Sequence, residues 1–320
     1  MVDAHDSAGA DRSSVERGLA ATEAFSLLAN ETRMAILLAL WENHGPQSFT
    51  DLAENAGIAD TGNFNYHLGK LTGQFVMSRE NGYDLTRAGR RALTAVLAED
   101  LTALPRMERT TVDRSCPYCD ATVEIVPVDD DLRVCCTNCE GVFGGTTTSI
   151  RTDTPHPDST ITIVPLPTAG LRDRTPEEIL DVGVAWSIQR ALSFARGACP
   201  ECSGTVRTRI EVCPDHDDRG ICDACSRRIS GRVDFHCDTC QNGMVTNLTI
   251  VALLDSQVLG FFDRHGYDLL RPSFEDGGAL ISSSETVLSE DPLAYEATWT
   301  FDGDELTVRI DDALDVEVVR

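Results

Sequence analysis

Between residues 27 and 72, apolar residues recur at helical spacing in three segments, and polar residues fill the positions between them. Asn30 and Ser48 stand directly before the first two segments, where a side-chain oxygen caps the N-terminus of a helix. A short turn at 57–60 separates the second segment from the third. Two helices joined by a turn of this length predict a helix-turn-helix unit.

The third helix, expected from about 61 to 72, would bury Phe64, Leu68 and Leu71 and turn its polar residues outward. After it, apolar and polar residues alternate about Asn81 and Gly82, which predicts a two-residue hairpin, the wing. Outward Asn, Tyr and Lys side chains suit a helix that enters the major groove of DNA. The candidate DNA-binding residues are therefore Thr61, Gly62, Asn63, Asn65, Tyr66 and Lys70 on the helix and Arg79 on the hairpin.

This stretch resembles the ArsR-like family of winged-helix transcriptional regulators. The resemblance covers about the first third of the chain and lies in LANETR at 28–33, LAENAGI at 52–58 and NYHLGKL at 65–71. It implies a regulator that binds double-stranded operator DNA as a homodimer. The metal-sensing subgroup carries a cysteine pair on the helix before the recognition helix, but residues 50–58 hold no cysteine. We therefore expect no metal sensing at that place.

The helix expected after the hairpin, at 86–104, is long and amphipathic. In the ArsR-like family a helix at this position is suited to dimer contact, so the resemblance implies a homodimer built on it. The apolar seam of that contact would consist of Leu93, Val96, Leu97, Leu101 and Leu104.

The chain is strongly acidic, with 27 Lys and Arg against 52 Asp and Glu and a net charge of -25. Asp is the commoner acid and Lys70 is the only lysine, which resembles the proteins of extremely halophilic archaea. An acidic mesophilic protein is the alternative. Residues 61–95 are the exception, because this stretch contains five basic residues and two acidic ones, Glu80 and Asp84. This locally basic stretch coincides with the predicted recognition helix and wing, where phosphates would lie.

No apolar run approaches the roughly 18 residues that span a bilayer. The first 14 residues are polar and acidic, unlike a signal peptide, and we expect residues 1–18 to be disordered. We therefore expect a soluble, cytoplasmic protein without a membrane partner.

Twelve cysteines in a chain of this kind indicate metal sites more than disulfides. In the first group, two Cys-x-x-Cys pairs flank two expected strands, 122–128 and 132–135, joined by the acidic turn 129–131. A hairpin brings such pairs together and predicts a zinc ribbon over 109–150, with Cys116, Cys119, Cys136 and Cys139 as ligands. Cys135 is left over, and we expect it to face the core.

The second group holds eight candidate ligands around two expected strands, 205–212 and 229–235. If these strands pair antiparallel, one end gathers Cys199, Cys202, Cys237 and Cys240, and the other gathers Cys213, His216, Cys222 and Cys225. The rival pairing joins Cys199 and Cys202 to Cys222 and Cys225, but it separates the remaining four ligands. We prefer the two-ended hairpin, which predicts three structural Zn²⁺ ions per chain.

Catalysis is not indicated. Sites made of four cysteines, or of three cysteines and a histidine, are closed, whereas a catalytic zinc keeps an open position. No His-Glu-x-x-His, deaminase-like or P-loop pattern occurs. We expect no enzyme, and a hydrolase with a zinc-activated water is the weakest hypothesis.

The remaining segments predict an α+β region. Strands are expected at 160–167, 247–253, 286–288, 294–301 and 305–310, and helices from Thr175 to about Arg196 and at 256–265. The predicted fold class is α+β: a disordered tail at 1–18, a winged helix at 19–108, a zinc ribbon at 109–150 and an α+β domain at 151–320, into which the two-zinc hairpin 199–240 is inserted. The last region resembles C-terminal regions attached to winged helices in halophilic archaea, which implies no ligand.

Two functions remain open. The first is a sequence-specific transcriptional regulator whose zinc-bearing region senses a signal or contacts another protein. The second is an interaction module of the transcription machinery, because a winged helix followed by a zinc ribbon also resembles the archaeal homologue of the alpha subunit of general transcription factor E. The polar recognition helix favours the regulator.

Overall fold

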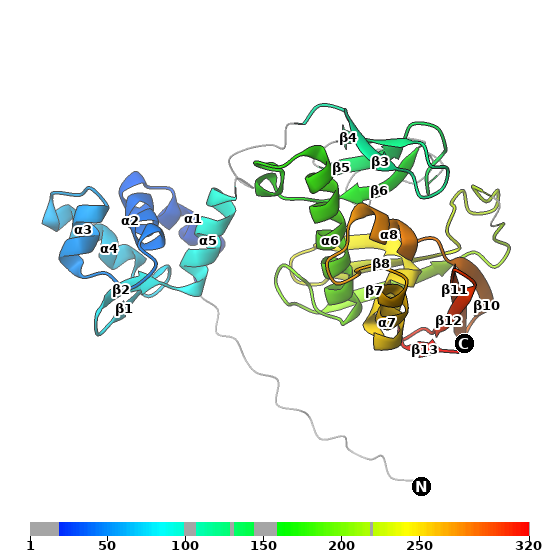
Figure 1. Cartoon of the computed structure of the whole chain (residues 1–320). Helices are drawn as coiled ribbons and strands as arrows, with labels where there is room; N and C mark the ends of the chain where they lie inside the picture. The colour runs from blue at the N-terminus through cyan, green and yellow to red at the C-terminus, as the bar shows by residue number, and fades with distance from the viewer. Residues whose placement is uncertain (1–18, 99–106, 129–130, 144–158, 218–219, 320) are drawn as a thin grey trace, which may run out of the picture. The chain divides into compact units, whose positions relative to one another are not determined.

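The structure, a computed structural model, describes residues 19–98, 107–128, 131–143, 159–217 and 220–319. The chain divides into two compact units, 1–102 and 103–320 (Figure 1). The expected disordered tail at 1–18 lies outside the described residues. Helices and several antiparallel sheets make up the two units, so the α+β class is confirmed.

The N-terminal unit consists of helices and one hairpin. In chain order these are α1 (Ala21–Leu28), α2 (Glu31–Glu42), α3 (Phe49–Asn55), α4 (Thr61–Leu71), β1 (Val76–Arg79), β2 (Gly82–Leu85) and α5 (Arg87–Leu97). Side-chain caps begin the middle helices: Asn30 accepts from the Arg33 amide, Ser48 from that of Asp51, and Asp60 from those of Gly62 and Asn63. Each cap satisfies an amide that has no partner within its helix.

A single apolar core holds this unit together. The buried residues of α2, α3 and α4 meet the hairpin and α5 there, and the core includes Ile36, Leu37, Leu40, Leu52, Phe64, Leu68, Leu71, Val76, Leu85 and Leu93. The hairpin register pairs Arg79 with Gly82, and Gln47 bridges to Tyr83 on the other edge of β2. Gly82 has φ +129°, and a Cβ there would collide with the Gln47 carbonyl, so the turn requires glycine.

Within its described residues, the C-terminal unit contains three antiparallel sheets. The first is β3 (Thr110–Ser115), β4 (Thr122–Val128), β5 (Asp131–Cys136) and β6 (Thr160–Val164); the second is β7 (Val206–Val212), β8 (Gly231–Cys237) and β9 (Gly243–Asn247); the third is β10 (Ser284–Glu290), β11 (Leu293–Phe301), β12 (Asp304–Ile310) and β13 (Val316–Val318). Each is a meander in which neighbours in sequence are neighbours in space.

Helices join these sheets into one core. They are the 3-10 helix η1 (Thr168–Leu171), α6 (Pro176–Ala195), the 3-10 helix η2 (Leu248–Leu254), α7 (Ser256–Arg264) and α8 (Phe274–Leu280). The long helix α6 contacts β3, β6, η2 and α8 (Figure 1). A capping box of Thr175 and Glu178 begins α6, as expected.

Two expectations need correction. Residues 247–253 were expected to form a strand, but β9 ends at Asn247 and residues Leu248–Leu254 form a 3-10 helix. All the side chains from Leu248 to Leu253 are buried. The sequence therefore shows no alternation of buried and exposed residues by which a strand could be distinguished from a helix. The expected ribbon at 109–150 is also not a separate module. The strand β6 belongs to the same sheet as β3, β4 and β5, and the apolar residues of these strands belong to the core of the whole C-terminal unit.

Candidate metal centres and nucleic-acid interface

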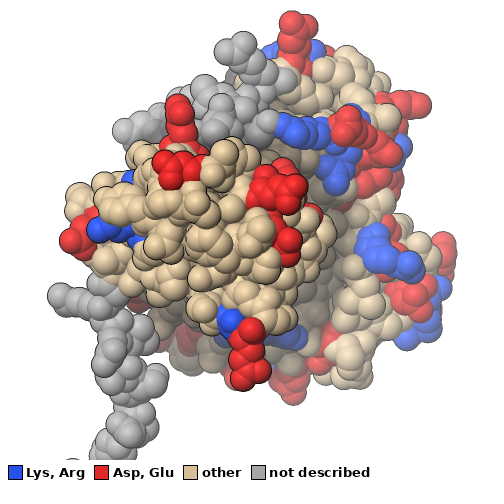
Figure 2. All heavy atoms as spheres, turned by 90° about the vertical axis from the view of Figure 1, so that its left-hand side faces the viewer, with Lys and Arg blue, Asp and Glu red and all other residues tan. Residues whose placement is uncertain are grey.

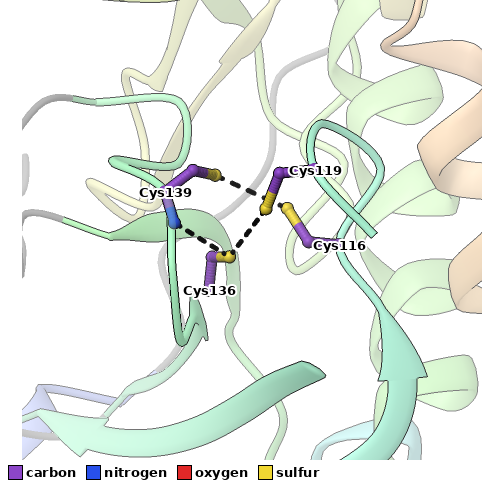
Figure 3. A group of neighbouring side chains, drawn as sticks. All are labelled: Cys116, Cys119, Cys136 and Cys139. Atoms are coloured by element: carbon purple, nitrogen blue, oxygen red, sulfur yellow. Dashed lines mark hydrogen bonds between the residues drawn. The ribbon is translucent and has the colours of Figure 1, made fainter. Parts of the chain in front are cut away.

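The first cysteine cluster lies where two loops of the first sheet meet (Figure 3). Cys116 and Cys119 lie between β3 and β4, while Cys136 ends β5 and Cys139 follows it. The register places Val123 of β4 opposite Cys136, so the two Cys-x-x-Cys loops are adjacent. The Sγ atoms of Cys116 and Cys139 are 3.7 Å apart, and those of Cys119 and Cys136 are 3.4 Å apart.

Backbone amides turn toward the sulfur atoms of this cluster. The amides of Asn138 and Cys139 both donate to Cys136 Sγ at 3.3 Å. The backbone N–H of Ala121 lowers the pKa of the Cys119 thiol to about 7. A thiolate is the form that binds a metal, so these amides prepare the cluster for one.

The other two clusters lie at opposite ends of the hairpin of β7 and β8. Its register pairs Val206 with Cys237 at one end and Val212 with Gly231 at the other. At the first end, Cys199 Sγ is 3.6 Å from Cys240 Sγ, and Cys202 Sγ is 3.5 Å from Cys237 Sγ. The backbone N–H of Cys240 lowers the pKa of the Cys237 thiol to about 6.

The cluster at the far end contains Cys213, His216, Cys222 and Cys225. His216 Nδ1 lies 3.4 Å from Cys225 Sγ, and Nε2 lies 3.2 Å from the Arg228 carbonyl. A carbonyl only accepts, so Nε2 carries the proton and Nδ1 keeps a lone pair for a metal. The Asp217 amide lowers the pKa of the Cys222 thiol to about 7.

Within each cluster the four ligand atoms lie within 4.8 Å of one another, so each can hold one metal ion. The structure therefore groups the eight ligands as the two-ended hairpin predicts, four at each end of β7 and β8. The rival pairing, in which Cys199 and Cys202 join Cys222 and Cys225, does not occur. Cys135 lies outside the clusters: it is buried, its Sγ is 3.8 Å from Thr160 Oγ1, and burial raises its pKa.

The helix α4 presents one polar face. Thr61, Gly62, Asn63, Asn65, Tyr66 and Lys70 are all exposed, as is Arg79 of β1. Phe64, Leu68 and Leu71 are buried beneath them. Lys70 Nζ lies 5.6 Å from the centre of the Tyr66 ring, one helical turn away, and the side chain of Tyr66 is 60% exposed. A stacked cation of this kind holds both side chains on the same surface.

Asp84 pairs with two of the arginines counted at 61–95, and the residue count alone does not show this pairing. Its carboxylate, nearly buried on β2, lies 3.4 Å from Arg79 Nε and 3.1 Å from Arg90 Nη2. Two of the five expected bases are therefore paired within the unit. In Figure 2 the nearer surface is mostly uncharged, and its acidic and basic side chains form separate small groups.

No helix within the described residues is long and apolar enough to cross a membrane. Two family models match the chain, and both are described as domains of unknown function: DUF7347 matches residues 21–96, and DUF7351 matches residues 113–316. No curated protein and no solved structure matches it. The DUF7351 model spans more than half of the chain, which therefore belongs to that family.

Proposed function

We propose that the chain is a sequence-specific DNA-binding transcriptional regulator whose N-terminal unit is a winged helix-turn-helix domain of the ArsR-like kind. The observation that carries this proposal is the exposed polar face of α4. That helix follows α3 after a short turn and precedes a hairpin, which is the order of recognition helix and wing.

The chemistry of the face suits base edges and phosphates. Asn63 and Asn65 carry amides that can pair with the N6 and N7 atoms of adenine, and Lys70 can reach guanine or a phosphate. Tyr66 adds a flat surface and a hydroxyl. Thr61 and Gly62 lie in the first turn of α4, and Arg79 lies at the end of β1 beside the hairpin turn; we assign these residues to backbone phosphates.

Three zinc ions fit the three clusters. Tetrahedral bonds of about 2.3 Å place the sulfur atoms around one zinc about 3.8 Å apart, close to the 3.4–3.7 Å between the paired sulfurs of the two four-cysteine clusters. In the third cluster, His216 Nδ1 lies 3.4 Å from Cys225 Sγ. Each site supplies four protein ligands and leaves no position for a substrate water. We infer structural zinc that stabilises the loops, and no enzyme.

The regulator would act as a homodimer through α5 and the residues that follow it. Leu93 is buried within the N-terminal unit, but Leu97 is 41% exposed at the end of α5. Leu101 and Leu104 of the expected seam lie outside the described residues.

One observation favours the second candidate, an interaction module of the transcription machinery. Asp84 binds Arg79 and Arg90, and this partly neutralises two charges that would otherwise be available to phosphates, whose neutralisation supplies much of the affinity for DNA. A module that binds polymerase would need few such charges.

The test is the DNA affinity of the variant Asn63→Ala with Lys70→Ala. Each good base contact contributes about 1–3 kcal/mol, so the double variant should bind a site selected from random DNA well over tenfold more weakly. The exposed residue Glu54 of α3 provides the control variant Glu54→Gln, which should bind as the wild type does. An unchanged affinity in the folded double variant would remove α4 from the DNA interface.

A further inference from the structure

Arg228 holds a ligand of the third cluster, which consists of Cys213, His216, Cys222 and Cys225. The residue follows Cys225 by three positions, and its backbone carbonyl lies 3.2 Å from His216 Nε2. Nε2 therefore donates to this carbonyl, and the ring is held with Nδ1 3.4 Å from Cys225 Sγ. A histidine that binds a metal is commonly oriented through its other nitrogen in this way.

The same residue contacts both loops of the first cluster, which consists of Cys116, Cys119, Cys136 and Cys139. The Arg228 guanidinium lies 4.6 Å from the centre of the Tyr118 ring, and Tyr118 belongs to the loop that runs from Cys116 to Cys119. Arg228 Nε donates to the Gly141 carbonyl at 2.9 Å, and the Arg228 amide donates to the Val142 carbonyl at 2.8 Å. Gly141 and Val142 follow Cys139 closely, so Arg228 lies between the ligand loops of two clusters.

The segment of Gly141 and Val142 is itself fixed against β6. The Val142 amide donates to the carbonyl of the buried Thr160 at 2.8 Å. Gly141 has φ +64°, and a Cβ there would collide with the same carbonyl, so the position requires glycine. The two carbonyls that hold Arg228 therefore have one defined position once the loop before them is ordered.

The second cluster, which consists of Cys199, Cys202, Cys237 and Cys240, has a different anchor. It lies at the other end of the β7–β8 hairpin, six residue steps or about 20 Å from the third cluster. The buried Arg190 of α6 pairs there with Glu201 of the first loop, and its Nη2 donates to Asn242 Oδ1 at 2.9 Å, just after the second loop. The second cluster therefore depends on α6, whereas the first and third depend on Arg228.

We propose that Arg228 couples the first and third clusters, so that a zinc ion in either one strengthens zinc binding in the other, while the second cluster binds its ion independently. An ion in the first cluster orders the loops that hold Arg228, and Arg228 then orients His216. Thermodynamic linkage requires the same effect in the opposite direction. The proposal rests on the inference that the clusters bind zinc, but not on DNA binding, because all these residues lie within 103–320.

The experiment removes one ligand from the first cluster of the full chain, by Cys119→Ser, and titrates a zinc chelator against the variant. The nitrogen NMR signals of His216 report whether Nδ1 holds an ion, and elemental analysis counts the ions per chain. Contacts to a metal ligand commonly change metal affinity about 10–100-fold, so the third cluster should bind zinc at least about tenfold more weakly than in the wild type. The ion that remains in the second cluster shows that the unit is folded.

The matched control is Cys202→Ser, which removes the equivalent ligand from the second cluster and should leave the zinc affinity of the third cluster unchanged. Equal weakening of the third cluster by both substitutions would mean a general loss of stability and would overturn the coupling.

Arg228→Met tests the bridge itself, because methionine keeps an unbranched apolar stem but has neither the charge nor the N–H donors. In this background, Cys119→Ser should weaken the third cluster by less than about threefold. Arg264→Met alters an exposed arginine at the end of α7, and in that background the tenfold effect should remain. A tenfold effect that persists in Arg228→Met would overturn the role of Arg228.

Failure of the coupling and failure of the zinc assignment give different results. Three ions per wild-type chain, with an unchanged third cluster in Cys119→Ser, would overturn the coupling alone. Fewer than three ions in the wild type, or a His216 Nδ1 that never holds an ion, would overturn the zinc assignment and the coupling together.

Discussion

At the scale of single residues, Asp84 determines how much positive charge the N-terminal unit would offer to DNA in the proposed regulator. The carboxylate is almost buried, accepts from the Leu85 amide at 2.7 Å and binds two arginines whose side chains are about half exposed. The sequence shows five bases against two acids at 61–95 but not which of them are paired. That pairing depends on the hairpin register, which turns Asp84 inward.

Asp84→Asn should release Arg79 and Arg90 toward solvent. Half-exposed ion pairs contribute little, so the free energy of unfolding should fall by only about 1 kcal/mol. Each added phosphate contact steepens the dependence of log K on log salt by about 0.9. We expect tighter DNA binding at low salt and a slope steeper by about 1–2, measured by fluorescence anisotropy.

Glu54→Gln changes the net charge equally without releasing an arginine, and it should leave the slope unchanged. The same slope in Asp84→Asn as in the wild type would mean that these arginines do not reach phosphates.

At the scale of elements, local signals predicted most of the described structure. Asn30, Ser48 and Thr175 cap the expected helices, because a capping oxygen acts within one turn. The grouping of the eight ligands also followed from a single hairpin. By contrast, β3, β9, β13 and the short α8 were not expected. The three strands bury at most one residue each, so no alternation of apolar and polar residues marks them in the sequence.

The two ends of the β7–β8 hairpin should lose metal independently. Cys199→Ser removes one ligand of the cluster that contains Cys237 and Cys240, so bound zinc should fall from three ions per chain to two, measured by elemental analysis. The other end should keep its ion.

The matched control is Cys135→Ser, which alters a buried cysteine outside the clusters and should keep three ions. Loss of two ions from Cys199→Ser would instead indicate that the two ends share ligands or fold together.

At the scale of the whole molecule, the two compact units agree with the two family matches. The unit 1–102 contains the match at 21–96, and the unit 103–320 contains the match at 113–316. From the sequence we expected the winged helix to end at 108, and the first compact unit ends at 102. The shared core of the C-terminal unit was not predictable, because it joins residues as far apart as Val112 and Leu314.

The proposed dimer is tested at this scale. Leu97→Asp with Leu101→Asp places charges in the expected seam, so the variant should sediment as a monomer and lose DNA affinity, while the wild type should sediment as a dimer at micromolar concentration. Ala88→Asp, an acid in the exposed first turn of α5, should remain dimeric because that position favours negative charge. A monomeric wild type would contradict the dimer.

The central claim, DNA recognition by α4, is tested most directly by mapping the bound sites of the chain across its own genome at native salt. The account predicts discrete sites that share one sequence motif and disappear in the variant Asn63→Ala with Lys70→Ala. Occupancy that follows RNA polymerase along transcribed regions, without a shared motif and unchanged by the two substitutions, would contradict it.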